Sequence, residues 1–134
     1  MGRTRVEIGF RREQAFVFVL LLAAVLLLQV IGGAYSAALS GTEDEAAHYV
    51  TGLLFRDYVA SGLRTTPIEY AEDYYLHYPK VGIGHWPPVF YALQAVWTLP
   101  FGASRTSVLL LMAVIAAALA WSLYRFLRDA GLPG

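Results

Sequence analysis

Three consecutive acidic residues and a nearby histidine form the first group in the sequence that could do chemistry. Glu43, Asp44 and Glu45 follow a long uncharged run, and His48 comes four residues after Asp44. A carboxylate can serve as a general base, and residues four apart share one face of a helix. An aspartate and a histidine together offer two of the ligands that a divalent cation needs, which is half of a usual site. We therefore interpret Asp44 and His48 as candidate ligands of a divalent cation, the one cofactor that these residues suggest.

The same acids also have a purely structural explanation. Thr42 and Glu45 have the S/T-x-x-E spacing of a capping box, which predicts that a helix begins here and runs over about 43–61. Acids in the first turn of a helix interact favourably with its positive end, by roughly 0.3–1 kcal/mol each. Apolar residues recur along this helix at a spacing that makes one stripe, so we expect it to lie on a membrane surface, with Gly62 ending it.

A second candidate group lies in the aromatic segment between Tyr70 and Tyr91. Tyr78, Lys80 and His85 are spread along it, and Pro87-Pro88 follows directly. Aromatic rings can stack on a sugar, while lysine and histidine can bind phosphate. The structural alternative is that Tyr and Trp gather at a membrane interface, and that proline fits the first turn of a helix. The segment by itself leaves both interpretations open.

The elements that must position these groups are apolar helices. Residues 15–39 carry no charge, and as a helix they would rise about 37 Å, more than the ~30 Å of a bilayer's hydrocarbon core. Residues 1–14 form an arginine-rich leader, which places the N-terminus in the cytoplasm by the positive-inside rule. A cleaved signal peptide is the alternative, but its apolar region would be only about 7–15 residues long.

The rest of the chain continues this membrane pattern. Residues 40–86 are expected to form a loop outside the membrane, followed by two further apolar stretches over 87–101 and 107–124 and a polar tail over 125–134. The stretch 87–101 is short, so we expect it either to span or to be re-entrant. The predicted fold class is therefore an all-α membrane protein with about three transmembrane helices and an extracytoplasmic loop that holds a juxtamembrane amphipathic helix.

Composition narrows the possible functions. The 134 residues are 57% hydrophobic with a formal net charge of zero, which gives no reason to expect binding to nucleic acid. The absence of cysteine removes disulfides, thiolate metal ligands and thiol nucleophiles. We expect the lipid bilayer to be one partner of the chain.

Several motifs in this order resemble a known family. The sequence DEAAHY opens the helix after the first apolar run, Tyr78-Pro79 follows some thirty residues later, and HWPPVFY begins the next apolar stretch at His85. This resembles the N-terminal part of integral-membrane glycosyltransferases of the C superfamily, near the bacterial relatives of protein O-mannosyltransferases and the aminoarabinose transferase that modifies lipid A. The resemblance implies inverting sugar transfer from a polyprenyl-phosphate donor to an acceptor glycan, lipid or protein at the outer face of the cytoplasmic (inner) membrane.

The resemblance also implies roles for particular residues. Asp44 matches the family's catalytic aspartate, which is thought to deprotonate the acceptor hydroxyl, and Glu45 matches its acidic neighbour. His85 and the two prolines match a basic-Pro-Pro segment near the donor phosphate, although Trp86 stands between them here and leaves Lys80 as a substitute. The predicted substrate-binding residues are Glu45, His48, Tyr78, Lys80 and His85.

Two further expectations accompany this interpretation. The resemblance covers only the N-terminal portion of such an enzyme, so we expect the 134 residues alone to be inactive in transfer. The alternative is a small membrane interaction or scaffold protein that binds a partner or lipid through its aromatic loop. A transporter fragment is a weaker third option, because the apolar runs contain no buried charge.

Overall fold

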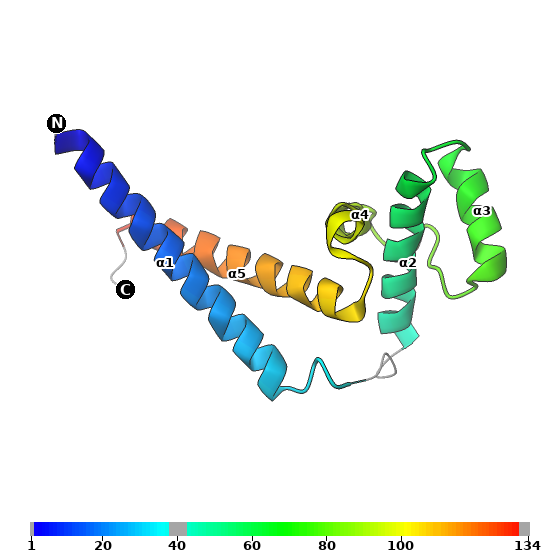
Figure 1. Ribbon diagram of the computed structural model, residues 1–134, viewed down its shortest axis with the longest axis horizontal. Coiled ribbons are helices and arrows are strands. Elements are labelled where there is room, and N and C mark those ends of the chain that lie inside the picture. The colour runs from blue at the N-terminus through cyan, green and yellow to red at the C-terminus, as the bar shows by residue number, and fades with distance from the viewer. Residues whose placement is uncertain (1, 38–42, 132–134) are drawn as a thin grey trace. The chain divides into compact units, whose positions relative to one another are not determined.

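The computed structural model describes residues 2–37 and 43–131, and these form five α-helices and no strand (Figure 1). The helices are α1 (Gly2–Ile31), α2 (Glu43–Ala60), α3 (Pro67–His77), α4 (Val89–Phe101) and α5 (Arg105–Asp129). The prediction of an all-α chain is therefore confirmed. The chain divides into two compact units, one made of residues 1–35 with 109–134 and the other of residues 36–108.

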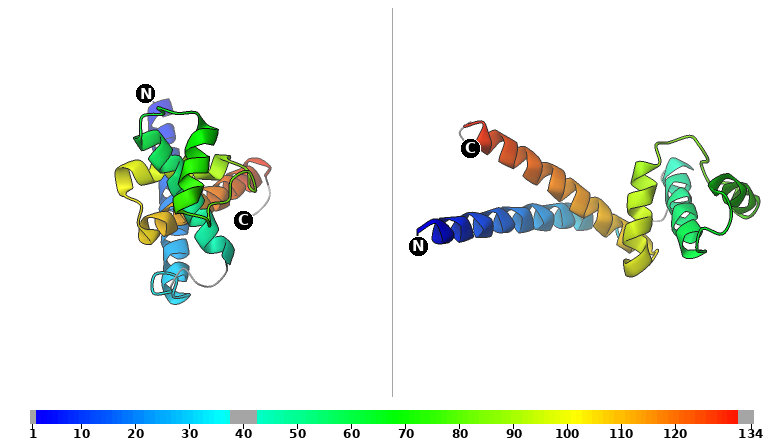
Figure 2. Two further views of the ribbon diagram at one scale, coloured as in Figure 1. Left: turned by 90° about the vertical axis from the view of Figure 1, so that its right-hand side faces the viewer. Right: turned by 90° about the horizontal axis from the view of Figure 1, so that it is seen from above.

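In the first unit, α1 and α5 run antiparallel (Figure 2). Contacts at three successive levels join them: Glu13 with Arg128, Phe18 with Trp121, and Gln29 with the backbone carbonyl of Leu109. The side of α5 that carries Ala113 and Ala117 is fully buried, because small side chains let two helices approach closely. The amide Nε2 of Gln29 donates to the Leu109 carbonyl at 3.0 Å, and the hydroxyl of Tyr35 donates to its Oε1 at 2.7 Å. Gln29, a polar side chain inside the first apolar run, is thus used to join the helices.

Within the described residues, two helices are long and apolar enough to cross a membrane. They are the part of α1 from Arg12 to Ile31, 20 residues long, and α5, 25 residues long. At ~1.5 Å per residue they rise about 30 Å and about 38 Å. The expected third span is not confirmed, because α4 has 13 residues and rises only about 20 Å. Pro87-Pro88 precedes α4, Pro100 lies in its last turn and Gly102 follows it with a φ of 82°, so the sequence limits the helix at both ends.

The first helix ends at Ile31 rather than at residue 39. Gly33 has a φ of 70°, in the left-handed region that suits glycine, and the amide of Ala34 donates back to the carbonyl of Gln29 at 2.9 Å. This arrangement ends a helix by satisfying its last carbonyls. Residues 38 and 39 lie outside the described part of the chain.

In the second unit, α2 is the middle helix and contacts both α3 and α4 (Figures 1 and 2). Between α2 and α4 the contact is close at Gly52, where an added Cβ would lie 2.1 Å from the carboxamide of the buried Gln94. Between α2 and α3 a small core excludes water, made of Leu54, Ala71, Tyr74 and Val81. The glycine expected to end α2 does so, since Gly62 follows its last turn with a φ of 81°.

Helix α3 was not predicted, although the sequence carries its signal. Thr66 and Glu69 form a complete capping box: the Glu69 amide donates to the Thr66 hydroxyl at 3.3 Å, and the Thr66 amide donates to the Glu69 carboxylate at 3.1 Å. Pro67 occupies the first helical position, where its missing N–H costs nothing. The density of tyrosines in this segment had favoured an interfacial loop instead.

Candidate functional site

The start of α2 carries the predicted acidic residues. Asp44 is exposed, and Glu45 is partly exposed. An oxygen of the Glu45 carboxylate lies 3.2 Å from a guanidinium nitrogen of Arg105, in the first turn of α5 and within the same unit. Glu45 therefore helps to hold α2 near the start of α5. The capping role expected of Thr42 falls on a residue outside the described part of the chain.

His48 makes the most specific contacts of the predicted residues. Its Nδ1 lies 2.6 Å from the hydroxyl oxygen of Tyr91 in α4, and its ring centre lies 4.2 Å from that of Trp86. Trp86 and Tyr91 both belong to the HWPPVFY segment. The helix that begins at the acidic residues and the segment that contains the two prolines thus meet at His48.

A glycine holds the tryptophan in this position. The amide of Gly82 donates to the hydroxyl of Thr51 at 3.0 Å, which fixes the loop to α2. A Cβ on Gly82 would lie 2.1 Å from Cζ3 of Trp86, far inside van der Waals contact, so the indole ring needs the space that glycine leaves. The ring of His48 also lies against this indole, with the ring centres 4.2 Å apart. Gly82, Trp86 and His48 therefore form one stack across the loop and α2.

Two cavities flank Trp86. One, of about 490 Å³, lies between α2, the start of α3 and the loop, and its wall is almost wholly apolar and aromatic, with Leu54, Phe55, Tyr58 and Tyr91 among its lining residues. The other, of about 610 Å³, is more open and includes the polar side chains of Glu72 and His85. Trp86, together with Gly82 and Ile83, lines both cavities, so the apolar cavity and the more open one are adjacent along these residues.

The remaining predicted residues lie along the loop. His85 is exposed, lines the open cavity and has its Nδ1 3.3 Å from the carbonyl oxygen of Ile83. Tyr78 follows the last residue of α3, with its ring centre 4.6 Å from that of Tyr74. Lys80 is exposed. His48 and His85 both have rings against Trp86, and they are the two predicted residues that the structure brings to one side chain.

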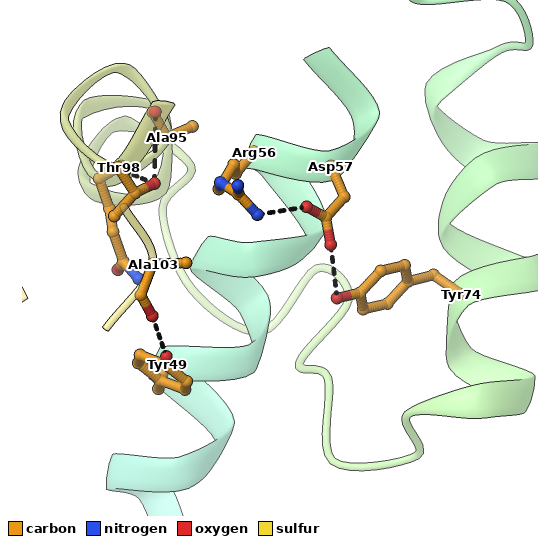
Figure 3. Close-up of polar contacts among 8 residues, drawn as sticks. Tyr49, Arg56, Asp57, Tyr74, Ala95, Thr98 and Ala103 are labelled. Carbon is orange, nitrogen blue, oxygen red and sulfur yellow. Dashed lines mark hydrogen bonds and ion pairs between the residues drawn. The ribbon is translucent and has the colours of Figure 1, made fainter. Parts of the chain in front are cut away.

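Sequence reasoning did not predict a partly buried polar group that lies between α2 and α3. The hydroxyl of Tyr74 donates to Asp57 at 3.3 Å, and the guanidinium of Arg56 lies 3.0 Å from the same carboxylate (Figure 3). Burial raises the pKa of Tyr74 above the ordinary range of a phenol, and the charge of Asp57 raises it further. On the other side of α2, the hydroxyl of Tyr49 donates to the carbonyl of Ala103. These hydrogen bonds hold α2 against its neighbours, and they are separate from the contacts of His48 with Trp86 and Tyr91.

The two residues of the site that sequence reasoning missed are Trp86 and Tyr91. Both stood in the motif that carried the resemblance, and the aromatic residues of this segment were expected either to lie at a membrane interface or to stack on a sugar. In the described residues no three His, Asp or Glu side chains gather in a way that could hold a metal ion, so Asp44 and His48 remain an isolated pair of candidate ligands. The site thus offers the exposed carboxylate of Asp44, the imidazole of His48 against the ring of Trp86, and two adjacent cavities.

Comparison with known proteins adds no family to this description: no family model, no curated protein and no solved structure matches the chain.

Proposed function

We propose that the chain is the N-terminal part of an integral-membrane glycosyltransferase that moves a sugar from a polyprenyl-phosphate donor to an acceptor hydroxyl. One observation carries this proposal. The helix that opens with Asp44 and the segment that contains Pro87-Pro88 are joined by His48, whose ring contacts both Trp86 and Tyr91. This contact between the two segments that carry the resemblance supports the proposal, because a shared substrate would require them to be close.

The two adjacent cavities are consistent with an amphiphilic donor. A polyprenyl phosphate has a long apolar chain and a charged head, and it would need an apolar compartment beside a polar one. The apolar cavity and the more open cavity with Glu72 and His85 are adjacent through Trp86. In this arrangement His85 would serve the phosphate, with Lys80 nearby in the sequence as a second cation.

Asp44 would act as the base in this reaction. Inverting transfer needs a base that faces the anomeric carbon from the side opposite the leaving phosphate, and correct alignment supplies much of the rate. Asp44 is exposed at the start of α2, one turn before His48 on the same helix, so an acceptor hydroxyl can reach it. Glu45 is bonded to Arg105 and would support the helix rather than take the proton.

Membrane placement completes the proposal. The two spanning helices α1 and α5 would anchor the chain in the cytoplasmic membrane, with the N-terminus inside and residues 36–108 at the outer face. Because α4 is too short to span upright, it would enter the outer leaflet as a re-entrant helix or cross only where the bilayer is thin.

Asp44→Asn tests the catalytic assignment. The assay measures transfer of labelled sugar from a polyprenyl-phosphate donor by membranes that contain the complete gene product. We expect Asp44→Asn to lower transfer by at least ~100-fold, the size typical of losing a general base. Glu43→Gln is the matched control and should retain most of the activity. Near-normal transfer by Asp44→Asn would refute the role of Asp44.

Donor binding can be tested on the 134 residues themselves. A short isoprenyl phosphate, titrated into the chain in detergent micelles, should change the fluorescence of Trp86, which lines both cavities. Trp86→Phe should remove that change, whereas Trp97→Phe should retain it. The corresponding isoprenol, which lacks the phosphate, should bind more weakly. Equal binding of the two compounds would count against a phosphate site.

A second function is favoured by the outer surface of α3. Ile68 is 71% exposed and Leu76 is 78% exposed, and Tyr75 and Tyr78 next to Leu76 are about half exposed. A membrane interaction protein would present such side chains to a partner or to lipid. Ile68→Ser with Leu76→Ser would abolish vesicle or partner binding in that case, while Asp44→Asn would leave it unchanged.

A further inference from the structure

The hydroxyl group of Tyr91 has a single hydrogen-bond partner. Tyr91 is 2% exposed, and its hydroxyl oxygen lies 2.6 Å from Nδ1 of His48. Among residues 2–37 and 43–131 the hydroxyl makes no other hydrogen bond. A buried hydroxyl needs an acceptor for its hydrogen. In the part of the chain that the structure describes, the acceptor that it reaches is Nδ1 of His48.

The need of the Tyr91 hydroxyl for an acceptor fixes the direction of its hydrogen bond with His48. If Nδ1 carried the hydrogen and donated to Tyr91, the phenolic hydrogen would remain buried without an acceptor, which is unfavourable. Hence the phenol donates and Nδ1 accepts. In a neutral imidazole one nitrogen carries the hydrogen, so the hydrogen of His48 must be on Nε2.

The ring is also fixed in orientation. Trp86 lies against it with the ring centres 4.2 Å apart and the planes at 41°, and Gly82 leaves the space that the indole occupies. Rotation of the imidazole would break the bond to Tyr91 and the contact with Trp86 together. The Nε2–H therefore points in one direction, and no side chain or carbonyl in the described parts of the chain accepts from it.

We infer that Tyr91 is a positioning residue that fixes His48 as an Nε2–H donor, and that this donor binds a phosphate oxygen of the ligand. The identity of the ligand rests on the proposed function, whereas the tautomer and the role of Tyr91 do not. A phosphate oxygen accepts hydrogen bonds and cannot donate them, so it complements a ring nitrogen that is held as a donor. The phosphate can belong to a lipid headgroup or be free in solution.

The test is nuclear magnetic resonance of the 134 residues, labelled with ¹⁵N-histidine, in detergent micelles. At about pH 8.5 the ring is observed above the ordinary histidine pKa of ~6.5. Two-bond ¹H–¹⁵N correlations then assign the tautomer of His48, with the exposed His77 and His85 as internal references. We expect Nε2–H alone at His48, together with a slowly exchanging Tyr91 hydroxyl proton. Observation of Nδ1–H at His48 would overturn the inference.

Tyr91→Phe tests the positioning role. The substitution keeps the ring and removes only the oxygen, so it should retain the fold but release His48 into a mixture of tautomers. Tyr75→Phe is the matched control, because Tyr75 is 48% exposed and lies away from His48 in the chain; it should leave the His48 signals unchanged. If Tyr91→Phe also leaves the tautomer and the ring signals of His48 unchanged, Tyr91 does not position the ring.

Ligand binding is read at the same nitrogen. Geranyl phosphate and inorganic phosphate are titrated separately. Binding should shift the Nε2 signal of His48 in the wild type. The affinity measured from this shift should be about fivefold to tenfold weaker in Tyr91→Phe, the usual effect of one hydrogen bond. A response to geranyl phosphate alone identifies a lipid source, and equal responses identify free phosphate. If neither compound perturbs Nε2, the phosphate assignment is wrong. Retained sugar transfer by Asp44→Asn would instead contradict the proposed function while leaving the tautomer result intact.

Discussion

Replacement of Gly82 by alanine perturbs the stack that joins the loop to α2. The added Cβ would lie 2.1 Å from Cζ3 and 2.7 Å from Cε3 of Trp86, and a rigid indole cannot yield as a flexible side chain can. The ring must leave its place against His48. A tryptophan typically buries about 150–250 Å², so losing roughly 100 Å² of that at ~25 cal/mol/Å² costs about 2.5 kcal/mol.

A smaller effect opposes this loss. Alanine restricts the unfolded chain more than glycine does, which stabilises the native state by about 0.4–1 kcal/mol. The net expectation is that Gly82→Ala lowers the free energy of unfolding by about 1.5–2 kcal/mol. Reversible unfolding in mixed micelles measures this change, and the ring-proton shifts of His48 report whether Trp86 has moved away.

Gly84→Ala is the control for this experiment. A Cβ at Gly84 meets nothing within 4 Å, but the residue has a φ of 73°, so alanine there is strained by about 1–2 kcal/mol in the left-handed region. Both variants should therefore lose stability, yet only Gly82→Ala should shift the ring signals of His48. Unchanged His48 signals in Gly82→Ala would refute the argument that the indole occupies the space over this glycine.

Three other substitutions have defined outcomes. Gln29→Leu removes the hydrogen bond from α1 to the backbone of α5, so it should lower stability in bicelles by about 0.6–2 kcal/mol; no loss would show that the bond has no net value in lipid. A double-mutant cycle on Glu45 and Arg105, which are 3.2 Å apart and partly exposed, should give a coupling below ~1 kcal/mol, and a larger value would indicate a desolvated pair. The backbone amide and then the hydroxyl of Thr66 lower the pKa of Glu69, so the stabilisation from this cap is present above the unfolded pKa of ~4.3 and is lost as pH falls through the lower folded value. A carboxyl titration followed by ¹³C resonance should show this lowered pKa, and Thr66→Ala should return it towards the ordinary value.

Much of the secondary structure follows from short-range signals in the sequence. The helix over 43–61 is α2, which ends at Ala60 before Gly62 as the glycine predicts. The uncharged runs give two helices of spanning length. The stretch over 87–101 was expected to be short and either to span or to be re-entrant, and α4 begins only at Val89, after Pro87 and Pro88.

The candidate site could be predicted only in part. Asp44 and His48 were selected because both are on one helix face, which is a local property. The contact of His48 with Tyr91 joins residues 43 apart, and the place of Trp86 depends on the missing side chain of Gly82. The amphipathic ring of a tyrosine is enough to explain its place near a membrane boundary. The amino-acid sequence therefore could not reveal that the hydroxyl of Tyr91 is buried against His48.

The amino-acid sequence by itself determined that the chain is helical, that it holds apolar runs long enough to cross a bilayer, and that acidic and aromatic residues lie between them, but it overestimated the number of spans at about three. These properties depend on composition and on residues a few positions apart, whose effect is the same in any fold. Tertiary structure decided that His48, Trp86 and Tyr91 meet, that two cavities share Trp86, and that Glu45 is bonded to Arg105. Those contacts depend on how α2 packs against α4 and the loop, and close packing is settled by the shapes of side chains distant in sequence.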